Sequence, residues 1–100
     1  MNFLVVAHDY TEKSTLAKRA ELRTRHQARI KDLARSKSLM NGGVILSGGN
    51  PIGSAFLFEL PDRSSLDAVL AADPYMAGGV WERIEVYDLA IPNPAGMTSR

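Results

Sequence analysis

The chain has 100 residues, 45% of them hydrophobic and 23% charged, which is typical of one soluble globular domain rather than a disordered or membrane-spanning chain. The net charge is only +1, so no broad basic surface for nucleic acid is expected. The chain contains no cysteine, which excludes disulfides, thiol nucleophiles and sulfur-bound zinc and agrees with a cytoplasmic location.

The first predicted element is a strand over Asn2 to His8. Both alternating sets of its side chains are apolar, so we expect the strand to be covered on both faces. These sets are Phe3, Val5 and Ala7 on one face and Leu4 and Val6 on the other. The apolar run breaks at His8-Asp9, which is too soon for a signal peptide or a membrane span.

A long helix is predicted from an N-cap at Ser14 or Thr15 to about Lys37, because this stretch contains neither Gly nor Pro. At about 100° per residue, several side chains fall within about 60° of Ile30 on one helical face. They are Leu16, Arg19, Arg23, His26, Leu33 and Ala34. Charged residues occupy the far side, so Arg23 and His26 are predicted to lie on the packed face.

Three strands and a short helix are predicted in the rest of the chain. A strand over Leu39 to Ser47 carries Gly42-Gly43, which indicates a bulge or a close backbone approach. Turn residues at 48–51 lead into a strand over Ser54 to Leu60, so the two strands are predicted to form a hairpin. A helix over Ser65 to Ala72 is expected to end at Asp73-Pro74. The last strand is predicted over Val80 to Ala90.

The predicted element order is strand, helix, strand, strand, helix, strand. This order is typical of the α+β ferredoxin-like βαββαβ sandwich, in which both helices cover one face of an antiparallel sheet. The other face would be bare and apolar, and we expect a homodimer to cover it. The residues predicted on that face are Leu4, Val6, Trp81, Tyr87 and Leu89. The domain is expected to span residues 1–91, followed by a Pro-containing tail over residues 92–100 that has no regular structure.

Three segments carry a resemblance to a known family. They are Val6 to Asp9, the Arg-x-x-His stretch within Leu22 to Arg29, and the Asp-Pro-Tyr-x-x-x-Gly-Val stretch within Ala72 to Glu82. With these segments in this order around a Gly-rich strand, the chain resembles the YciI-like (YCII-related) family over roughly residues 1–91. It departs from the commoner family pattern at Gly42-Gly43-Val44, which stands in place of Gly-Pro, and in a short hairpin loop.

The resemblance implies a dimeric α+β barrel type of ferredoxin-like fold, similar in shape to muconolactone isomerase and to small monooxygenase-like dimers. It also implies a His–Asp dyad in a pocket, which by position would be His26 and Asp73. Arg23, Asp9 and Tyr75 would be the neighbouring substrate-binding residues. One relative is a dehalogenase that acts on a chlorinated muconolactone by an elimination that begins with proton abstraction.

Each of these residues also has a structural interpretation. His26 could exchange a proton through one ring nitrogen while a carboxylate holds the other, or it could be a core histidine bound to a carbonyl. Asp73 could orient His26 or satisfy the backbone where the helix ends. Arg23 could bind a substrate carboxylate or form a salt bridge with Asp9 or Asp73. Asp9 could be a turn residue, and Tyr75 could donate to a ligand or pack beneath the helix.

If the protein is an enzyme, the resemblance and these residues together predict a lyase or isomerase that performs elimination or isomerisation on a small anionic or lactone-type molecule by general acid–base catalysis. His26 would be the base or acid, Asp73 would hold its tautomer, and Arg23 would attract the anion. The alternatives are a non-catalytic small-molecule binding module and a structural dimer. No cofactor or metal site is predicted, because the two histidines lack metal-ligand spacing.

Overall fold

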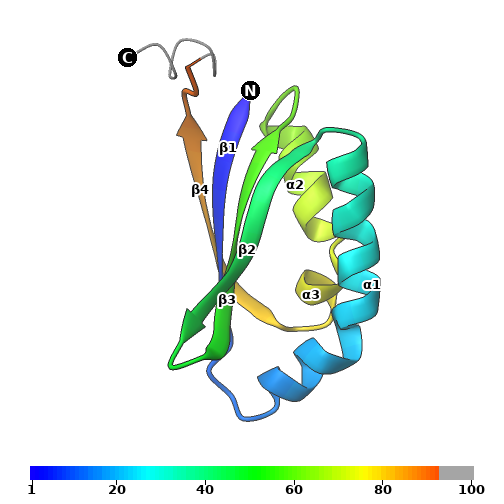
Figure 1. Cartoon of the computed structure of the whole chain (residues 1–100), viewed down its shortest axis with the longest axis vertical. Coiled ribbons are helices and arrows are strands. Elements are labelled where there is room, and N and C mark those ends of the chain that lie inside the picture. Colours follow the sequence, from blue (N-terminus) through cyan, green and yellow to red (C-terminus); the bar gives the residue numbers. More distant parts are fainter. Residues whose placement is uncertain (93–100) are drawn as a thin grey trace.

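A computed structural model of the chain describes residues 1–92, which form one antiparallel sheet with all helices on one of its faces (Figure 1). The strands have the order β2-β3-β1-β4 across the sheet. The elements are β1 (Asn2–Asp9), α1 (Thr15–Arg35), β2 (Leu39–Ser47), β3 (Asn50–Glu59), α2 (Arg63–Ala71), α3 (Pro74–Ala77) and β4 (Trp81–Leu89). The predicted ferredoxin-like βαββαβ fold is confirmed, with α3 as an additional short helix before β4.

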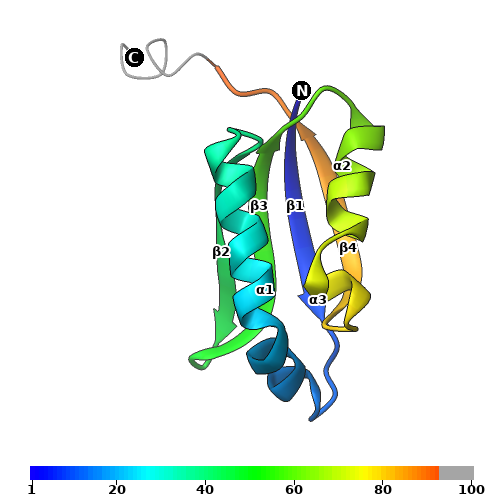
Figure 2. The same ribbon diagram turned by 90° about the vertical axis from the view of Figure 1, so that its right-hand side faces the viewer.

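The helices divide the covered face of the sheet between them. Figure 2 shows α1 over the side of the sheet that holds β2 and β3, and α2 with α3 over the side that holds β1 and β4. The core lies between these layers. Its side chains come from all four strands, all three helices and the connecting segments, and the fully buried ones include Phe3, Val5, Phe58, Leu66 and Val80.

The opposite surface of the sheet, here called the open face, carries no helix (Figure 1). Its side chains follow from the period of two along β1, where Phe3, Val5 and Ala7 are buried and the residues between them are half-buried. The residues of β3 and β4 opposite Leu4 and Val6 share that face. The apolar side chains of the open face include Leu4, Val6, Ala55, Leu57, Tyr87 and Leu89.

The prediction that Trp81 lies on the open face is wrong. The register of β4 on β1 shifts between His8 and Asp9, so His8 pairs with Arg83 while Asp9 pairs with Trp81. This bulge skips Glu82 and reverses the alternation of side chains at the start of β4. Trp81 therefore turns into the core, where it is only 3% exposed.

The packed face of α1 is rotated from the predicted one. Its buried residues are Thr15, Arg19, Leu22 and His26, whereas Arg23 is exposed. Leu22 is buried where Arg23 was expected, because α1 packs against α3. The two helices meet so closely that a Cβ added to Gly78, at the end of α3, would lie 2.2 Å from Leu22 Cδ1. The prediction that Arg23 belongs to the packed face is therefore wrong, and that for His26 is confirmed.

The segment between β3 and β4 holds one more helix than the sequence predicted. α2 begins at Arg63, where Asp62 accepts a hydrogen bond from the Ser65 backbone N–H. This bond also lowers the pKa of Asp62. Asp73-Pro74 ends α2, as expected, and also begins α3. An Asp N-cap followed by Pro at the first helical position is a start signal that the sequence analysis did not use.

Several smaller predictions concern turns and ends. β3 begins at Asn50 rather than Ser54, so the hairpin turn is confined to Gly48-Gly49. Gly42 lies where the backbone of β2 approaches β3 closely, since an added Cβ would lie 2.9 Å from the carbonyl oxygen of Ala55. Residues 93–100 of the predicted tail lie outside the described residues. No helix within residues 1–92 combines the length and the apolar character that a membrane span requires.

Candidate active site

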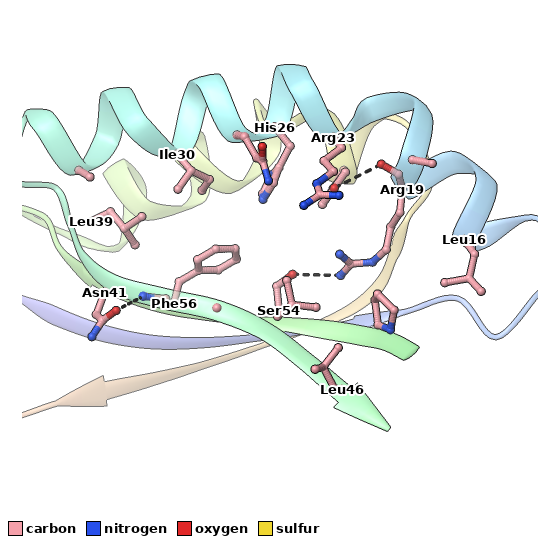
Figure 3. Close-up of a pocket in the computed structure, with 18 of the residues that line it drawn as sticks. Leu16, Arg19, Arg23, His26, Ile30, Leu39, Asn41, Leu46, Ser54 and Phe56 are labelled. Carbon is pink, nitrogen blue, oxygen red and sulfur yellow. Dashed lines mark hydrogen bonds between the residues drawn. The ribbon is translucent and has the colours of Figure 1, made fainter. Parts of the chain in front are cut away.

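A pocket of about 660 Å³ lies between α1 and the strands β2 and β3 (Figure 3). One wall is the side of α1 that carries Arg19, Arg23 and His26, and the opposite wall includes Ser54 and Phe56 of β3. The lining residues in the described part of the chain include no Asp or Glu. Leu22 of α1 packs against Gly78 at the end of α3, while Arg23 on the next position of the helix faces the pocket.

His26 and Asp73 are in direct contact. His26 Nδ1 lies 2.9 Å from Asp73 Oδ1 and 3.0 Å from Oδ2, and both residues are buried. A carboxylate can only accept hydrogen bonds, so it holds the proton of a neutral imidazole on Nδ1 and leaves a lone pair on Nε2. Nε2 forms no hydrogen bond with the residues that the structure describes, and the His26 ring lines the pocket. The predicted contact between His26 and Asp73 is present, while its catalytic role stays a prediction.

Asp73 also has a structural task. Its Oδ1 accepts a hydrogen bond of 2.8 Å from the Tyr75 backbone N–H and so caps α3. One carboxylate therefore fixes both the start of α3 and the orientation of the imidazole on α1. The functional and structural interpretations of Asp73 are compatible, because one oxygen serves both partners.

Aromatic side chains fix the plane of the His26 ring. The Tyr75 ring stacks on it with a centroid separation of 3.9 Å and an angle of 11°. Trp81 meets it edge-on at 5.9 Å, and Phe56 lies at 6.2 Å. Ring positions of this kind leave the imidazole little freedom to rotate, which favours a constant direction for Nε2.

Tyr75 is a wall of the site. It is buried, and its hydroxyl lies 3.4 Å from the backbone carbonyl oxygen of Arg19, to which it donates. Burial raises the pKa of the Tyr75 phenol, an effect that the nearby positive charges of Arg19 and Arg23 oppose. The neutral phenol therefore packs beneath α1, and the stacking of its ring on His26 is its main contribution to the pocket.

Arg19 is the site residue that the sequence analysis did not single out. Its Nε lies 2.5 Å from Asp9 Oδ2, and its Nη2 lies 3.1 Å from Asp9 Oδ1. Nη2 also donates to the Gly53 carbonyl and to Ser54 Oγ, each at 3.1 Å. This buried ion pair thus joins β1, α1 and β3. Arg19 belongs to the same predicted helical stripe as His26, so a second cation on that stripe was the available signal.

Arg23 does not form the salt bridge that the sequence analysis considered, because Asp9 pairs with Arg19 and Asp73 with His26. The exposed Arg23 side chain lines the pocket and forms no ion pair with a residue of the described chain. It therefore remains available to an anion. Asp9 is buried and bound to Arg19, which makes it a support of the pocket wall.

A second group of titratable side chains lies on the open face, away from the pocket. Glu85 accepts a hydrogen bond of 2.7 Å from the Tyr87 hydroxyl, and its other oxygen lies 2.5 Å from His8 Nε2. The Tyr87 bond, followed by the His8 bond, lowers the pKa of Glu85, while the bond to Glu85 raises the pKa of Tyr87. No cluster of three or more His, Asp or Glu residues that could hold a metal ion occurs within residues 1–92.

Comparison with solved structures shows the same fold in proteins of low sequence identity. The 5-chloro-2-hydroxyhydroquinone dehydrochlorinase of Burkholderia phenoliruptrix, solved with 2,5-dihydroxybenzoquinone, is 21% identical with a TM-score of 0.80. The match covers 90% of this chain and 94% of that protein. An antibiotic biosynthesis monooxygenase is 13% identical with a TM-score of 0.54, over 92% of this chain and 100% of its own. A conserved Methanosarcina mazei protein is 19% identical with a TM-score of 0.51, over 87% and 89%.

Sequence comparison supplies the family. No curated protein matches the chain at a significant level. The family model of the YCII-related domain matches residues 1–90, which is nearly the whole described chain. This match confirms the resemblance carried by the Arg-x-x-His and Asp-Pro-Tyr segments. The chain therefore belongs to the YCII-related domain family.

Proposed function

We propose that this protein is a proton-transfer enzyme, a lyase or isomerase that acts on a small anionic or lactone-type molecule. The observation that carries the proposal is the His26 imidazole, which is held by Asp73 at 2.9 Å through Nδ1 while its ring lines a pocket of about 660 Å³. A base held in this way can accept a proton at Nε2, and the carboxylate stabilises the imidazolium that results.

The proposed reaction starts when Nε2 takes a proton from the substrate. The electron pair of the broken bond then forms a new double bond, either in an enolate or by expulsion of a leaving group such as chloride. In an elimination the leaving group departs with its electrons, and His26 later passes its proton to water. In an isomerisation the same imidazolium returns the proton at another carbon. Neither route needs a redox partner.

Charge in the pocket supports an anionic substrate. The positive charge of Arg19 is neutralised by Asp9, whereas Arg23 faces the pocket without a carboxylate partner in the described chain. Arg23 precedes His26 by three residues on α1, so the two side chains are neighbours on the helix surface. An anionic group bound at Arg23 would therefore place an acidic proton of the same molecule near His26. A planar guanidinium suits carboxylates and enolates.

The dehydrochlorinase with the same fold performs a reaction of this class, namely loss of HCl from a chlorinated hydroxyhydroquinone. We therefore expect wild-type protein in D₂O to act on either 5-chloro-2-hydroxyhydroquinone or a muconolactone. The measurements are chloride release and deuterium incorporation followed by NMR.

The Arg23→Gln variant is expected to raise the KM of an accepted substrate about 10-fold or more, because a charge-assisted hydrogen bond is lost. Arg25→Gln is the matched control, since Arg25 is exposed on α1 and does not line the pocket. Compounds that bind with an Arg23-dependent affinity but are never turned over would instead support the non-catalytic binding module. Affinities that ignore Arg23 would contradict the anion site.

We further propose that the open face pairs with a second copy of the chain. Leu4 lies on that face between Leu57 and Tyr87, and Tyr87 is 48% exposed in the single chain. An apolar sheet face of this kind is costly to leave in water. In analytical ultracentrifugation, the Leu4→Arg variant is therefore expected to have the mass of one chain. Wild type and the variant Ala17→Arg, which changes an exposed position of α1, are expected to have the mass of two chains. A monomeric wild type would contradict the proposal.

A further inference from the structure

The pocket is an elongated trough that runs along α1. Its lining residues on α1 extend from Leu16 to Ala34, which at 1.5 Å per residue corresponds to about 27 Å of helix. His26 lies near the middle of this length, with lining residues on both sides of it (Figure 3). A molecule the size of one six-membered ring would fill only the part of the trough beside His26.

The two halves of the trough differ in chemistry. The half between His26 and Leu16 contains both arginines of the lining, Arg19 and Arg23, and the Ser54 hydroxyl, among apolar side chains such as Leu16 and Leu46. The other half, here called the apolar arm, is lined mainly by Ile30, Ala34, Leu39, Met40 and Phe56. The polar residues on this side, Gln27 and Asn41, are uncharged amides. Figure 3 shows Ile30, Leu39 and Phe56 on the opposite side of His26 from Arg19 and Leu16. A half that carries cations and an uncharged, largely apolar half therefore meet at the imidazole.

We infer that the trough takes an elongated amphipathic anion. Its carboxylate or phenolate would bind Arg23, its reacting carbon would lie at His26, and an alkyl or aryl extension would occupy the apolar arm. The position of the anionic end rests on the proposed function, whereas the extension is assigned by the apolar arm alone. The arm therefore makes a molecule with an apolar extension a better fit than an unsubstituted ring.

Exposure of the rim agrees with this assignment. Met40, which lines the apolar arm, is 47% exposed. A hydrocarbon chain along the apolar arm would cover this side chain and leave water itself. Burial of one CH₂ group corresponds to about a fourfold gain in affinity. Affinity should consequently rise with the length of the extension, while the charged end contributes a constant amount.

The test is calorimetric titration of the full chain with benzoate, 4-ethylbenzoate and 4-butylbenzoate. For wild type, we expect affinity to rise by about fourfold per CH₂. The Ala34→Glu variant should flatten this rise, because a carboxylate in the apolar arm keeps it hydrated. Ala17→Glu is the matched control, since Ala17 is an exposed residue of α1 that does not line the trough, and it should leave the rise unchanged.

The Arg23→Gln variant separates this inference from the proposed function. It should weaken all three benzoates by the same factor and keep the rise with chain length. A flat series in wild type, with affinities that still depend on Arg23, would overturn the apolar extension and leave the anion site in place. If affinity still rises with alkyl length in Ala34→Glu, the apolar extension is also overturned, because the alkyl groups would then bind outside the apolar arm. Affinities unaffected by Arg23→Gln would overturn the anionic end and, with it, the proposed substrate class.

Discussion

The Asp73→Asn variant is expected to keep its fold and to lose about 10²- to 10⁴-fold in turnover, the usual contribution of a positioned acid–base group. The reason lies in the two contacts of Asp73. Its Oδ1 caps α3 by accepting from the Tyr75 N–H at 2.8 Å, and the carboxylate accepts from His26 Nδ1 at 2.9 Å. Asn is a good N-cap residue, so its side-chain oxygen can keep the first contact.

The second contact changes its direction in this variant. With Oδ1 kept on the Tyr75 N–H, the Asn NH₂ group takes the place of Oδ2, which lies 3.0 Å from His26 Nδ1. An acceptor with a full negative charge is thereby replaced by a neutral amide whose NH₂ donates to Nδ1. The imidazole then carries its proton on Nε2, the nitrogen that is free of protein partners in the described chain, and it can no longer act as a base there. The same fold thus presents the wrong tautomer to the pocket.

Two measurements check this prediction. Nitrogen-15 NMR of the His26 ring reports the tautomer without a substrate, and it should show the proton on Nδ1 in wild type and on Nε2 in Asp73→Asn. Turnover of the accepted substrate should fall in parallel, and His26→Ala should fall at least as far. A variant with the changed tautomer and wild-type turnover would remove His26 from the proposed reaction and leave Asp73 with its capping role alone.

The Asp9→Ala variant is expected to lower the free energy of unfolding by about 3–5 kcal/mol, which is the usual cost of leaving a buried charge without its partner. Arg19 is only 7% exposed, and both Nε and Nη2 of its guanidinium are bonded to Asp9. Without Asp9, its remaining acceptors are the neutral Gly53 carbonyl and Ser54 hydroxyl. Neither of them balances the positive charge in a buried site.

Urea unfolding at constant protein concentration measures this loss, because association of chains would shift apparent stability. The exposed pair Arg63–Asp67 supplies the control: Asp67→Ala should change stability by about 0.5 kcal/mol or less. The double variant Asp9→Ala/Arg19→Met should recover part of the loss, since it removes the unpaired charge as well. A loss in Asp9→Ala as small as that in Asp67→Ala would show that solvent reaches Arg19 and that the pair does not hold the wall of the pocket.

The local elements were largely predictable because their signals lie within a few residues. Alternating apolar residues predicted β1, and the absence of Gly and Pro predicted α1 to within two residues of its C-terminal end. Asp73-Pro74 correctly predicted the end of α2. The same pair also begins α3, with Asp73 as its N-cap, and the sequence analysis did not predict this helix. The contact between His26 and Asp73 was predicted from the family resemblance, since the two residues lie 47 positions apart.

What the sequence determined by itself was the order of strands and helices, the fold, and the helical stripe that carries Arg19 and His26. Tertiary structure alone decided which cation is buried. Leu22 packs on Gly78, Arg19 pairs with Asp9, and Arg23 lies at the pocket. Tertiary structure also decided that Trp81 points into the core, because a single skipped residue in β4 reverses the alternation of side chains. Periodicity gives the angle of a side chain about its own element, but the neighbour against which that element packs decides which angle points inward.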